Sequence, residues 1–366
     1  MADASVDVLV VGGGMAGVSI GYELAAHASV LLAETEGELG THTTGRSAAV
    51  YAPSYGGAVV RAVTAASGPR YRELVDELGT GELLSPRTAL WLGCDDDGAA
   101  HVAEIAAGSD DVREISVAEA VALCPVLRPD AFRVAARDDS ASDIDVMALH
   151  QGYRRGLAAR GGTVWPASPV TALDRDGAGW LATVGGRHVR AGLVVDAAGA
   201  WADQVAGLAG VPTIGLVPMR RTAALASGTT APGLDWPLVA DAADRFYFRP
   251  DSGRVLVSPA DETPSEPCDA KPDELDVAIA IERVNEVTDL GLRTVHTAWA
   301  GLRSFVADRA PVVGVWPDHA GFVFFAGQGG YGIQLAPALA QLGAAIALGA
   351  APPEKINVAA SDLAPR

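Results

Sequence analysis

Cysteine is scarce in this sequence of 366 residues. The three cysteines, Cys94, Cys124 and Cys268, lie far apart and form no C-x-x-C pair. This spacing excludes a disulfide framework and the dithiol active site of pyridine-nucleotide-disulfide enzymes. We therefore expect three inert thiols.

Basic residues are also few, because 27 Lys and Arg stand against 45 Asp and Glu and give a formal net charge of −18. Nucleic-acid backbones and anionic membrane surfaces are bound through clustered Lys and Arg, so both kinds of partner are disfavoured. The acidic residues cluster beside Gly or Ser, which is typical of solvated loops, and we expect no bound metal. The three clusters are Asp95–Asp97, Asp110–Asp111 and Asp138–Asp139.

Long hydrophobic runs are missing as well. No stretch approaches the roughly 20 apolar residues of a membrane-spanning helix, so no transmembrane segment is expected. Residues 1–7 are polar and contain no Lys or Arg, unlike a secretory leader. These absences predict a cytoplasmic protein. The chain is longer than one hydrophobic core usually supports, which favours two lobes that share one site.

Glycine, in contrast, is abundant, with 42 residues. The apolar run that begins at Val8 continues into Gly12-x-Gly14-x-x-Gly17 and a helical pattern, which together indicate a dinucleotide site. Gly12 allows the tight turn, Gly14 the close approach of a pyrophosphate, and Gly17 the packing of the helix on the strand. The N-terminus of that helix attracts the phosphates.

A second apolar strand pattern, Val30–Ala33, ends on Glu34. An acidic residue at this place in a dinucleotide-binding unit accepts the hydroxyl groups of the adenosine ribose and disfavours a 2′-phosphate. The expected cofactor is therefore FAD or NAD rather than NADP.

The rest of the chain alternates between helix and strand patterns. Helices are expected over residues 61–78, 102–107, 117–123, 145–159, 274–287 and 333–348, and strands over 88–92, 131–136, 163–165, 193–196 and several stretches between 216 and 258. Residues 179–190 form a predicted hairpin with Gly185 and Gly186 at its turn. Pro337 is expected in the first turn of the last helix, whose N-terminus would point toward Gly329–Gly332.

Beyond the glycine turn, the chain contains the strings Thr44-Gly-Arg-Ser-Ala-Ala with Tyr55-Gly56, Leu84-Ser-Pro-Arg87, Ala148-Leu-His-Gln-Gly-Tyr153, Ala197-Ala-Gly-Ala-Trp201, Thr297-Ala-Trp-Ala-Gly-Leu-Arg-Ser-Phe-Val306 and Gln328-Gly-Gly-Tyr-Gly-Ile-Gln334. Together they resemble the FAD-dependent glycine/D-amino-acid oxidase superfamily, and within it the bacterial D-arginine dehydrogenase-type flavoproteins. The resemblance spans nearly the whole chain. It implies an α/β fold in which a Rossmann-like FAD-binding domain (residues 1–86, 141–215 and 300–366) is interleaved with a mostly antiparallel α+β substrate-binding domain (residues 87–140 and 216–299).

The resemblance also implies FAD, which we expect to be non-covalent because no cysteine falls in the flavin-facing segments. Gly45–Ala48 and Gly330–Gln334 would line the isoalloxazine, and Val170 would lie on the adenine side. The residues expected to bind the cofactor are Gly12, Gly14, Met15, Ala16, Gly17, Glu34, Thr44, Gly45, Arg46, Ser47, Ala48, Val170, Ala198, Gly199, Trp201, Arg303, Gly329, Gly330, Tyr331, Gly332, Ile333 and Gln334.

By the same resemblance, Arg303 would clamp the substrate carboxylate, and a guanidinium matches a carboxylate with two parallel hydrogen bonds. The alternative for Arg303 is an internal acidic partner, and for the nearby tyrosines it is ordinary core packing. Arg220 stands next to Arg221, which leaves open which of the two faces the pocket. The expected catalytic set is Arg303, Tyr55, Tyr247, Arg221 and Gly330. Hydride transfer to flavin needs no histidine base, so none is assigned to His42, His150 or His296.

Two positions depart from the D-arginine-type members. Val50 stands where they have a histidine, and Ala89 where they have a glutamate that would meet a cationic side chain. A buried guanidinium without that acid would cost several kcal/mol, so D-arginine is expected to be a poor substrate.

The expected reaction is oxidation of the Cα–N bond of a neutral or apolar D-amino acid to an imino acid, which hydrolyses to a 2-oxo acid and ammonia. The alternatives are a 2-hydroxy acid or secondary-amine oxidoreductase of the same superfamily, and a non-catalytic flavin-binding subunit. The sequence leaves the electron acceptor open among oxygen, a quinone and a protein.

Overall fold

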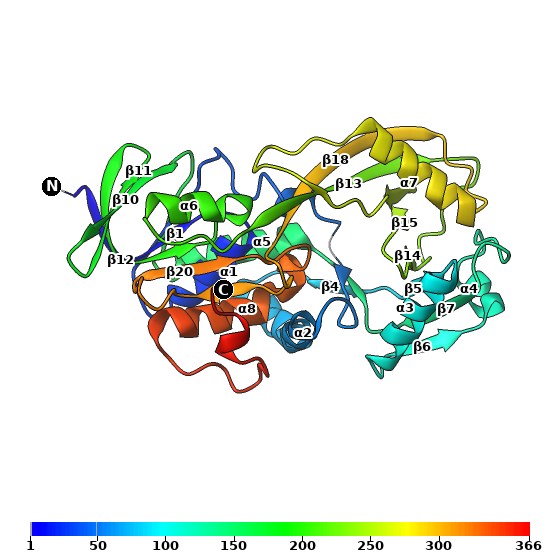
Figure 1. Ribbon diagram of the computed structural model, residues 1–366, viewed down its shortest axis with the longest axis horizontal. Helices are drawn as coiled ribbons and strands as arrows, with labels where there is room; N and C mark the ends of the chain where they lie inside the picture. The colour runs from blue at the N-terminus through cyan, green and yellow to red at the C-terminus, as the bar shows by residue number, and fades with distance from the viewer. Residues whose placement is uncertain (1, 49) are drawn as a thin grey trace.

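Two β-sheets lie side by side along the long axis of the molecule (Figure 1). The computed structural model describes residues 2–48 and 50–366. The first sheet has eight strands, in the order β10-β11-β12-β1-β2-β9 with β20 and then β19 joined to β12. Its strands are β1 (Ala4–Val11), β2 (Val30–Ala33), β9 (Thr163–Trp165), β10 (Val170–Asp176), β11 (Gly179–Val184), β12 (Arg187–Asp196), β19 (Val312–Gly314) and β20 (Phe322–Ala326).

The central strand β1 pairs in parallel with β2 and β12, and its second half, Val8–Val11, is buried on both faces. Val8 and Val10 point into a core with the helices α1 (Met15–Leu24), α2 (Ala58–Leu78), α5 (Val146–Ala159) and α8 (Gly332–Leu348). Leu9 and Val11 point to the opposite side, toward α6 (Ala202–Leu208) and the β10–β12 strands. Burial on both faces explains why this strand is a continuous apolar run.

The predicted hairpin is present, with Gly185 and Gly186 both at positive φ (56° and 77°) in its turn, as a tight turn of this kind requires. Its second strand and the predicted strand 193–196 prove to be one continuous element, β12. The first half of β12 pairs antiparallel with β11, and the whole strand also pairs in parallel with β1. The hairpin therefore extends the parallel sheet directly.

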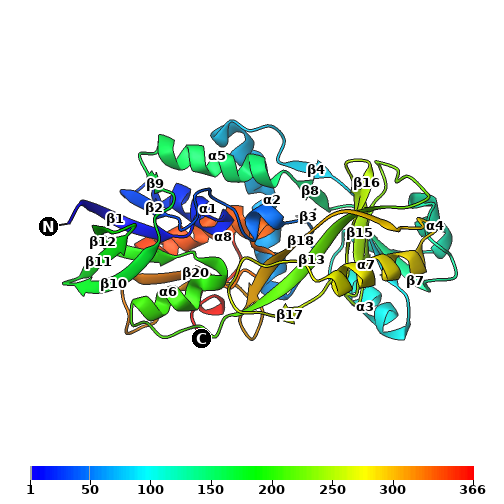
Figure 2. The same cartoon turned by 90° about the horizontal axis from the view of Figure 1, so that it is seen from above.

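The second sheet has nine strands, in the order β17-β13-β16-β15-β14-β5-β7-β6 with β18 on β13, and all its pairings are antiparallel except that of β14 with β5. The long strands β13 and β18 reach from this sheet back toward the first (Figure 2). Its strands are β5 (Ala89–Gly93), β6 (Val112–Ile115), β7 (Val134–Asp138), β13 (Val217–Ser227), β14 (Leu238–Asp241), β15 (Tyr247–Asp251), β16 (Arg254–Ser258), β17 (Thr263–Pro264) and β18 (Thr294–Phe305).

One face of this second sheet packs against the helix α7 (Glu274–Val287), and its other face is turned toward the functional site. Residues such as Leu90 and Val257 meet Val284 of α7 in the core on the packed face. The remaining elements are α3 (Asp96–Ala107), α4 (Val117–Leu123), the three-stranded sheet of β3 (Val50–Tyr51), β8 (Ser142–Ile144) and β4 (Leu84–Pro86), and the short helices η1 (Thr44–Arg46), η2 (Gly199–Trp201) and η3 (Ala360–Asp362).

Helix caps agree with the sequence signals. The side chain of Asp145 accepts a hydrogen bond from the backbone N–H of Ala148, so α5 begins one residue after the predicted cap. Helix α4 begins behind a capping box in which Ser116 and Glu119 bond to each other's backbone N–H groups. Local chemistry of this kind fixes helix starts independently of the fold.

The expectation that Asp138 and Asp139 lie in a solvated loop is wrong for Asp138. The strand predicted over 131–136 lies at Val134–Asp138, and the Asp138 side chain is fully buried. Its two oxygens accept hydrogen bonds from the hydroxyls of Ser140, at 2.6 Å, and Ser54, at 2.5 Å. Asp138 is thus a buried polar anchor rather than part of a solvated loop.

The architecture is the mixed α/β fold that the sequence predicts, with a parallel nucleotide-binding unit and a mostly antiparallel second sheet. Strand β18 crosses the domain boundary expected at residues 299–300. Across residues 2–48 and 50–366, no helix has the length and apolar character that crossing a membrane requires.

Candidate active site

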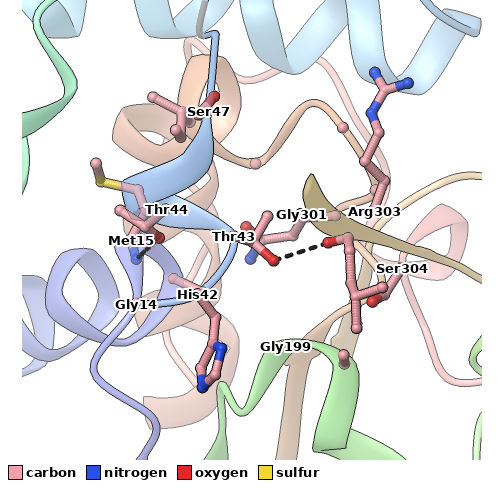
Figure 3. Close-up of a pocket in the computed structure, with 18 of the residues that line it drawn as sticks. Gly14, Met15, His42, Thr43, Thr44, Ser47, Gly199, Gly301, Arg303 and Ser304 are labelled. Carbon is pink, nitrogen blue, oxygen red and sulfur yellow. Dashed lines mark hydrogen bonds between the residues drawn. The ribbon is translucent and has the colours of Figure 1, made fainter. Parts of the chain in front are cut away.

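One cavity of about 630 Å³ is lined by residues of both large sheets (Figure 3). At one end it is bounded by the loops that follow β1, β2 and β12, where Gly12, Glu34 and Ala198 lie. At the other end it meets the open face of the second sheet at Trp91 and Leu238. Ligands of parallel α/β sheets bind in this way, outside the carboxyl ends of the strands.

The glycine turn after β1 requires its glycines. Gly12 has φ +105°, and a Cβ atom there would lie 2.5 Å from the carbonyl oxygen of Ala197. A Cβ on Gly17 would lie 1.8 Å from the carbonyl oxygen of Gly12. Gly17 therefore lets α1 pack on the turn, the role that the sequence predicts, and does not itself line the cavity.

Glu34 and His150 fix this turn from two sides. The Glu34 carboxylate accepts hydrogen bonds from the backbone N–H groups of Gly13, at 2.7 Å, and Glu36, at 2.8 Å. The buried ring of His150 places Nε2 2.9 Å from the carbonyl oxygen of Gly13. Burial lowers the pKa of His150. Because His150 does not line the cavity, it positions the turn and is no catalytic base.

The loop that contains Thr43–Ala48 is tied to both halves of the molecule (Figure 3). The hydroxyl of Thr44 accepts a hydrogen bond from the backbone N–H of Met15, at 2.9 Å, at the start of α1. The hydroxyl of Thr43 donates to a backbone carbonyl of β18, at 2.8 Å, and Arg46 donates to another, at 3.1 Å. Ser47 follows directly and lines the cavity.

The N-terminus of α8 faces the same cavity, but Pro337 is not in its first turn. The helix begins at Gly332, which makes Pro337 its sixth residue. A proline there cannot donate to the carbonyl of Ile333. The hydroxyl of Tyr71 on α2 donates to that carbonyl instead, at 2.7 Å, and so satisfies the freed group.

Arg303 lies on β18 at the substrate end of the cavity. Its guanidinium makes no hydrogen bond within the described part of the chain, and its Nη1 is buried. A Cβ on Gly330 would lie within 2.0 Å of the guanidinium, so the glycine leaves room for the arginine to reach over the start of α8. Among residues 2–48 and 50–366, the acidic group within 4 Å of the Arg303 guanidinium is Glu262, whose carboxylate is 3.7 Å away.

Tyr55 and Tyr247 line the cavity beside Arg303. The ring of Tyr55 stacks on Trp91, with ring centroids 5.7 Å apart, and its hydroxyl lies 3.4 Å from the carboxylate of Asp244. Burial, with the charge of Asp244, raises the pKa of Tyr55 to about 12. Tyr55 is thus a neutral hydrogen-bond donor at physiological pH.

Of the two adjacent arginines, Arg221 faces the cavity. Its Nε donates to the backbone carbonyl of Asp261, at 2.8 Å, and its Nη2 lies 3.3 Å from Glu262. Arg220 points to the other side of β13, where it pairs with Asp276 at 2.7 Å. Alternation along a strand explains this choice.

The two departures from the D-arginine-type sequences lie at different depths. Val50 lines the cavity, whereas Ala89 is buried behind the wall that Leu238 and Tyr247 form. Placing Ala89 in the substrate pocket is therefore wrong. An acidic group does reach the cavity from another loop, because Asp244, at φ +56°, is among the lining residues.

Several buried polar atoms of the cavity wall have no hydrogen-bond partner among the described residues. They are His42 Nδ1, Arg303 Nη1, Ser304 Oγ and Gln328 Nε2. Buried polar groups are normally paired, so these atoms, together with the backbone cradle at Gly12, fit a long polar ligand such as FAD. None of the three cysteines lines the cavity.

The cavity brings together nearly all residues that the sequence singles out. The whole expected catalytic set lines it, and so does the expected cofactor set apart from Gly17 and Gly45. A Cβ on Gly45 would lie 2.6 Å from the carbonyl oxygen of Gly40, which indicates a packing role. His296 lies elsewhere and bonds to the hydroxyl of Ser227, at 2.8 Å.

Other lining residues were missed. Some follow a simple signal, because alternate residues of one strand face the same way, as Arg221 and Ala223 do on β13. Others come from loops whose position no local pattern reveals. The missed residues include Thr35, Glu36, Thr43, Ala52, Trp91, Gln204, Leu208, Ala223, Leu238, Ala240, Leu302, Ser304 and Gln328.

Comparison with known proteins agrees with this geometry. The chain is 24% identical to glycine oxidase of Geobacillus kaustophilus over 90% of each chain, and the crystal structure of that enzyme has a TM-score of 0.85 at 99% coverage of both. L-Proline dehydrogenase from P. horikoshii also has a TM-score of 0.85, at 19% identity, over 99% of this chain and 97% of that one.

A shorter similarity links the chain to the bovine (Bos taurus) FAD-dependent oxidoreductase domain-containing protein 1, which is 32% identical over 41% of this chain and 34% of that protein. The chain thus matches about a third of the length of that relative. The family model described as FAD dependent oxidoreductase matches residues 7–346. The protein therefore belongs to the DAO family of FAD-dependent oxidoreductases, and FAD is its cofactor.

Proposed function

We propose that this protein oxidises the Cα–N bond of a neutral or apolar D-amino acid. The observation that carries the proposal is Arg303, a cavity-lining guanidinium to which no acceptor in the described part of the chain is hydrogen-bonded. A substrate carboxylate would supply the missing acceptor, and hydrogen bonds to charged groups contribute roughly 1.5–3 kcal/mol. The D configuration rests on the sequence resemblance.

The protein's part in this reaction is to hold the substrate. Arg303 and the hydroxyls of Tyr55 and Tyr247 would bind its carboxylate, while Val50 and Leu238 would enclose its side chain and exclude water. When bound, FAD supplies the chemistry by accepting the hydride from Cα. The amino group loses a proton, and water then hydrolyses the imino acid to a 2-oxo acid and ammonia.

Names of relatives support an amino-acid substrate, because glycine oxidase and L-proline dehydrogenase share the fold. We propose that the residues expected to bind FAD do so without a covalent bond, since no cysteine faces the cavity. Acid or heat should release all the flavin. Flavin that stays with the denatured chain would contradict this, and His42 would then be the first residue to examine.

Anaerobic titration of the purified protein with D- and L-amino acids tests the proposal, with bleaching of the flavin absorbance as the measurement. We expect bleaching by neutral D-amino acids and formation of the 2-oxo acid. Bleaching by 2-hydroxy acids or secondary amines alone would favour the alternative substrates.

A further inference from the structure

Glu262 lies behind the proposed carboxylate clamp, on the loop between β16 and β17. One of its oxygens, Oε1, faces three guanidinium groups. It is 2.7 Å from Arg309, 3.3 Å from Arg221 and 3.7 Å from Arg303. No sequence motif marks this glutamate, which does not line the cavity itself.

The three contacts are unequal. Glu262 accepts hydrogen bonds from Arg309 and Arg221, whereas its distance from Arg303 is too long for one. Burial opposes ionisation of Glu262, but the guanidinium groups outweigh it and lower the pKa of the carboxyl. Glu262 is therefore anionic at neutral pH and already hydrogen-bonded to two arginines.

The charges around the clamp leave one cation without an acceptor. Arg221, Arg303 and Arg309 carry three positive charges, and Glu262 and Asp244 carry two negative ones. Asp244 lies 3.9 Å from Arg221 on the cavity side, so carboxylates approach Arg221 from two directions. Of these three arginines, Arg303 alone has no hydrogen-bonded partner among the described residues, and it can bind one anionic group.

We propose that Glu262 is a specificity-determining residue that limits the enzyme to substrates with a single carboxylate. It does so by satisfying Arg221, which would otherwise offer a second anion site in the cavity. A second substrate carboxylate near Arg221 would meet the charges of Glu262 and Asp244, and like charges in contact oppose binding. The inference rests on the proposed function, because it assumes that Arg303 binds a carboxylate.

The test is Glu262→Gln in the holoenzyme, which keeps the shape of the side chain and removes its charge. The matched control is Glu266→Gln, an exposed glutamate on the next loop, between β17 and α7, that makes no ion pair within the described residues. We expect kcat/KM for D-aspartate and D-glutamate, relative to D-leucine, to rise about tenfold in Glu262→Gln and to stay unchanged in the control. Equal ratios in Glu262→Gln and the wild type, or an equal rise in both variants, would overturn the proposal.

The double variant Arg221→Gln/Glu262→Gln identifies the group that a second carboxylate uses. The gain for dicarboxylates should disappear, because it requires the guanidinium that Glu262→Gln sets free. A gain that persists without Arg221 would overturn the proposal.

Binding of succinate and propionate gives a readout that needs no turnover. These acids perturb the flavin absorption when they bind near it, and the wild type should bind propionate more tightly than succinate. Tighter binding of succinate by the wild type would overturn the inference even if the Glu262→Gln variant does not fold. If no amino acid reduces the wild-type flavin, the proposed function fails, while these affinities still test Glu262.

Discussion

The two ends of the cavity are built by different means. The cofactor end consists mainly of backbone and small residues in short consecutive stretches, such as Gly12–Ala16 and Gly329–Gln334. The substrate end consists of single side chains on separate strands, such as Trp91, Tyr247 and Arg303. Consequently, changes at the cofactor end should abolish the holoenzyme, whereas changes at the substrate end should alter rate or selectivity and leave the flavin bound.

The largest effect is expected at the cofactor end, from Gly17→Ala. The new Cβ would lie 1.8 Å from the carbonyl oxygen of Gly12, so the turn or α1 must move, at a cost of at least about 3 kcal/mol. The variant should purify without FAD or fail to fold, as the flavin-to-protein absorbance ratio and circular dichroism would show. Gly37→Ala is the control, because nothing lies within 4 Å of a Cβ there. Normal FAD content in Gly17→Ala would contradict the prediction.

At the substrate end, Arg303→Ala should lower kcat/KM by about 10²–10³, which corresponds to a loss of about 3–4 kcal/mol for a buried carboxylate clamp. The FAD content should remain normal, which is the contrast with Gly17→Ala. Arg221→Ala should lose less, because Arg221 is already bonded to Asp261 and Glu262. A kcat/KM of Arg303→Ala within about threefold of the wild-type value would show that Arg303 does not bind the substrate carboxylate.

Selectivity for the side chain is the next prediction. Burying a side chain the size of leucine contributes roughly 1.5–3 kcal/mol, and a poorly paired cation is penalised, so D-Leu, D-Met or D-Phe should exceed D-Arg and D-Lys at least about tenfold in kcat/KM. Asp244 is the acidic group that could favour a cation. Asp244→Asn should therefore increase the ratio of kcat/KM for D-Leu to kcat/KM for D-Arg. A wild type that prefers D-Arg, with the preference lost in Asp244→Asn, would show that Asp244 pairs with the substrate cation.

The smallest effect is expected from Asp196, a fully buried carboxyl at the end of β12. Burial raises the pKa of Asp196 well above its ordinary value of 3.8. The folded protein then holds a proton that the unfolded chain has released, so stability falls as the pH rises from the ordinary pKa toward the raised one.

Asp196→Asn removes this titration and should make Tm depend less on pH. The comparison is the difference in Tm between wild type and variant, measured across the pH range in which both hold FAD. The wild type should lose a few °C relative to the variant as the pH rises, since 1 kcal/mol corresponds to about 2–4 °C for 150–250 residues and to somewhat less in a longer chain. If the plots of Tm against pH for the wild type and Asp196→Asn run parallel, Asp196 is already ionised in the folded protein.

Much of the cofactor end could be predicted from the sequence, because its determinants are local. The glycine pattern at Gly12, the acid that ends β2 and the cap of α5 are each signalled within a few consecutive residues of the sequence. The family match and the mixed α/β fold confirm the predicted family and fold class. The domain boundaries and the individual cofactor contacts stay predictions.

The substrate end could be predicted only in part, because it depends on residues far apart in the chain. The burial of Ala89 is decided by Leu238 and Tyr247, and the partners of Arg221 come from residues 244 and 261–262. Pro337 lies beyond the first turn of α8, and the contact that accommodates it there, from Tyr71 on α2 to the carbonyl of Ile333, joins residues far apart in the sequence. A pattern of neighbouring residues in the sequence does not predict such long-range contacts.

The cofactor cavity joins segments that lie far apart in the sequence, and this has a consequence for biosynthesis. Gly330 and Gln334 follow Gly12 by more than three hundred residues, so they leave the ribosome much later than Gly12 does. Domains fold during synthesis as their segments emerge, but this cavity has no wall beside Arg303 until α8 has been made. FAD loading is therefore a late step, and a chain interrupted before α8 would expose the apolar face of β1 to aggregation and proteolysis.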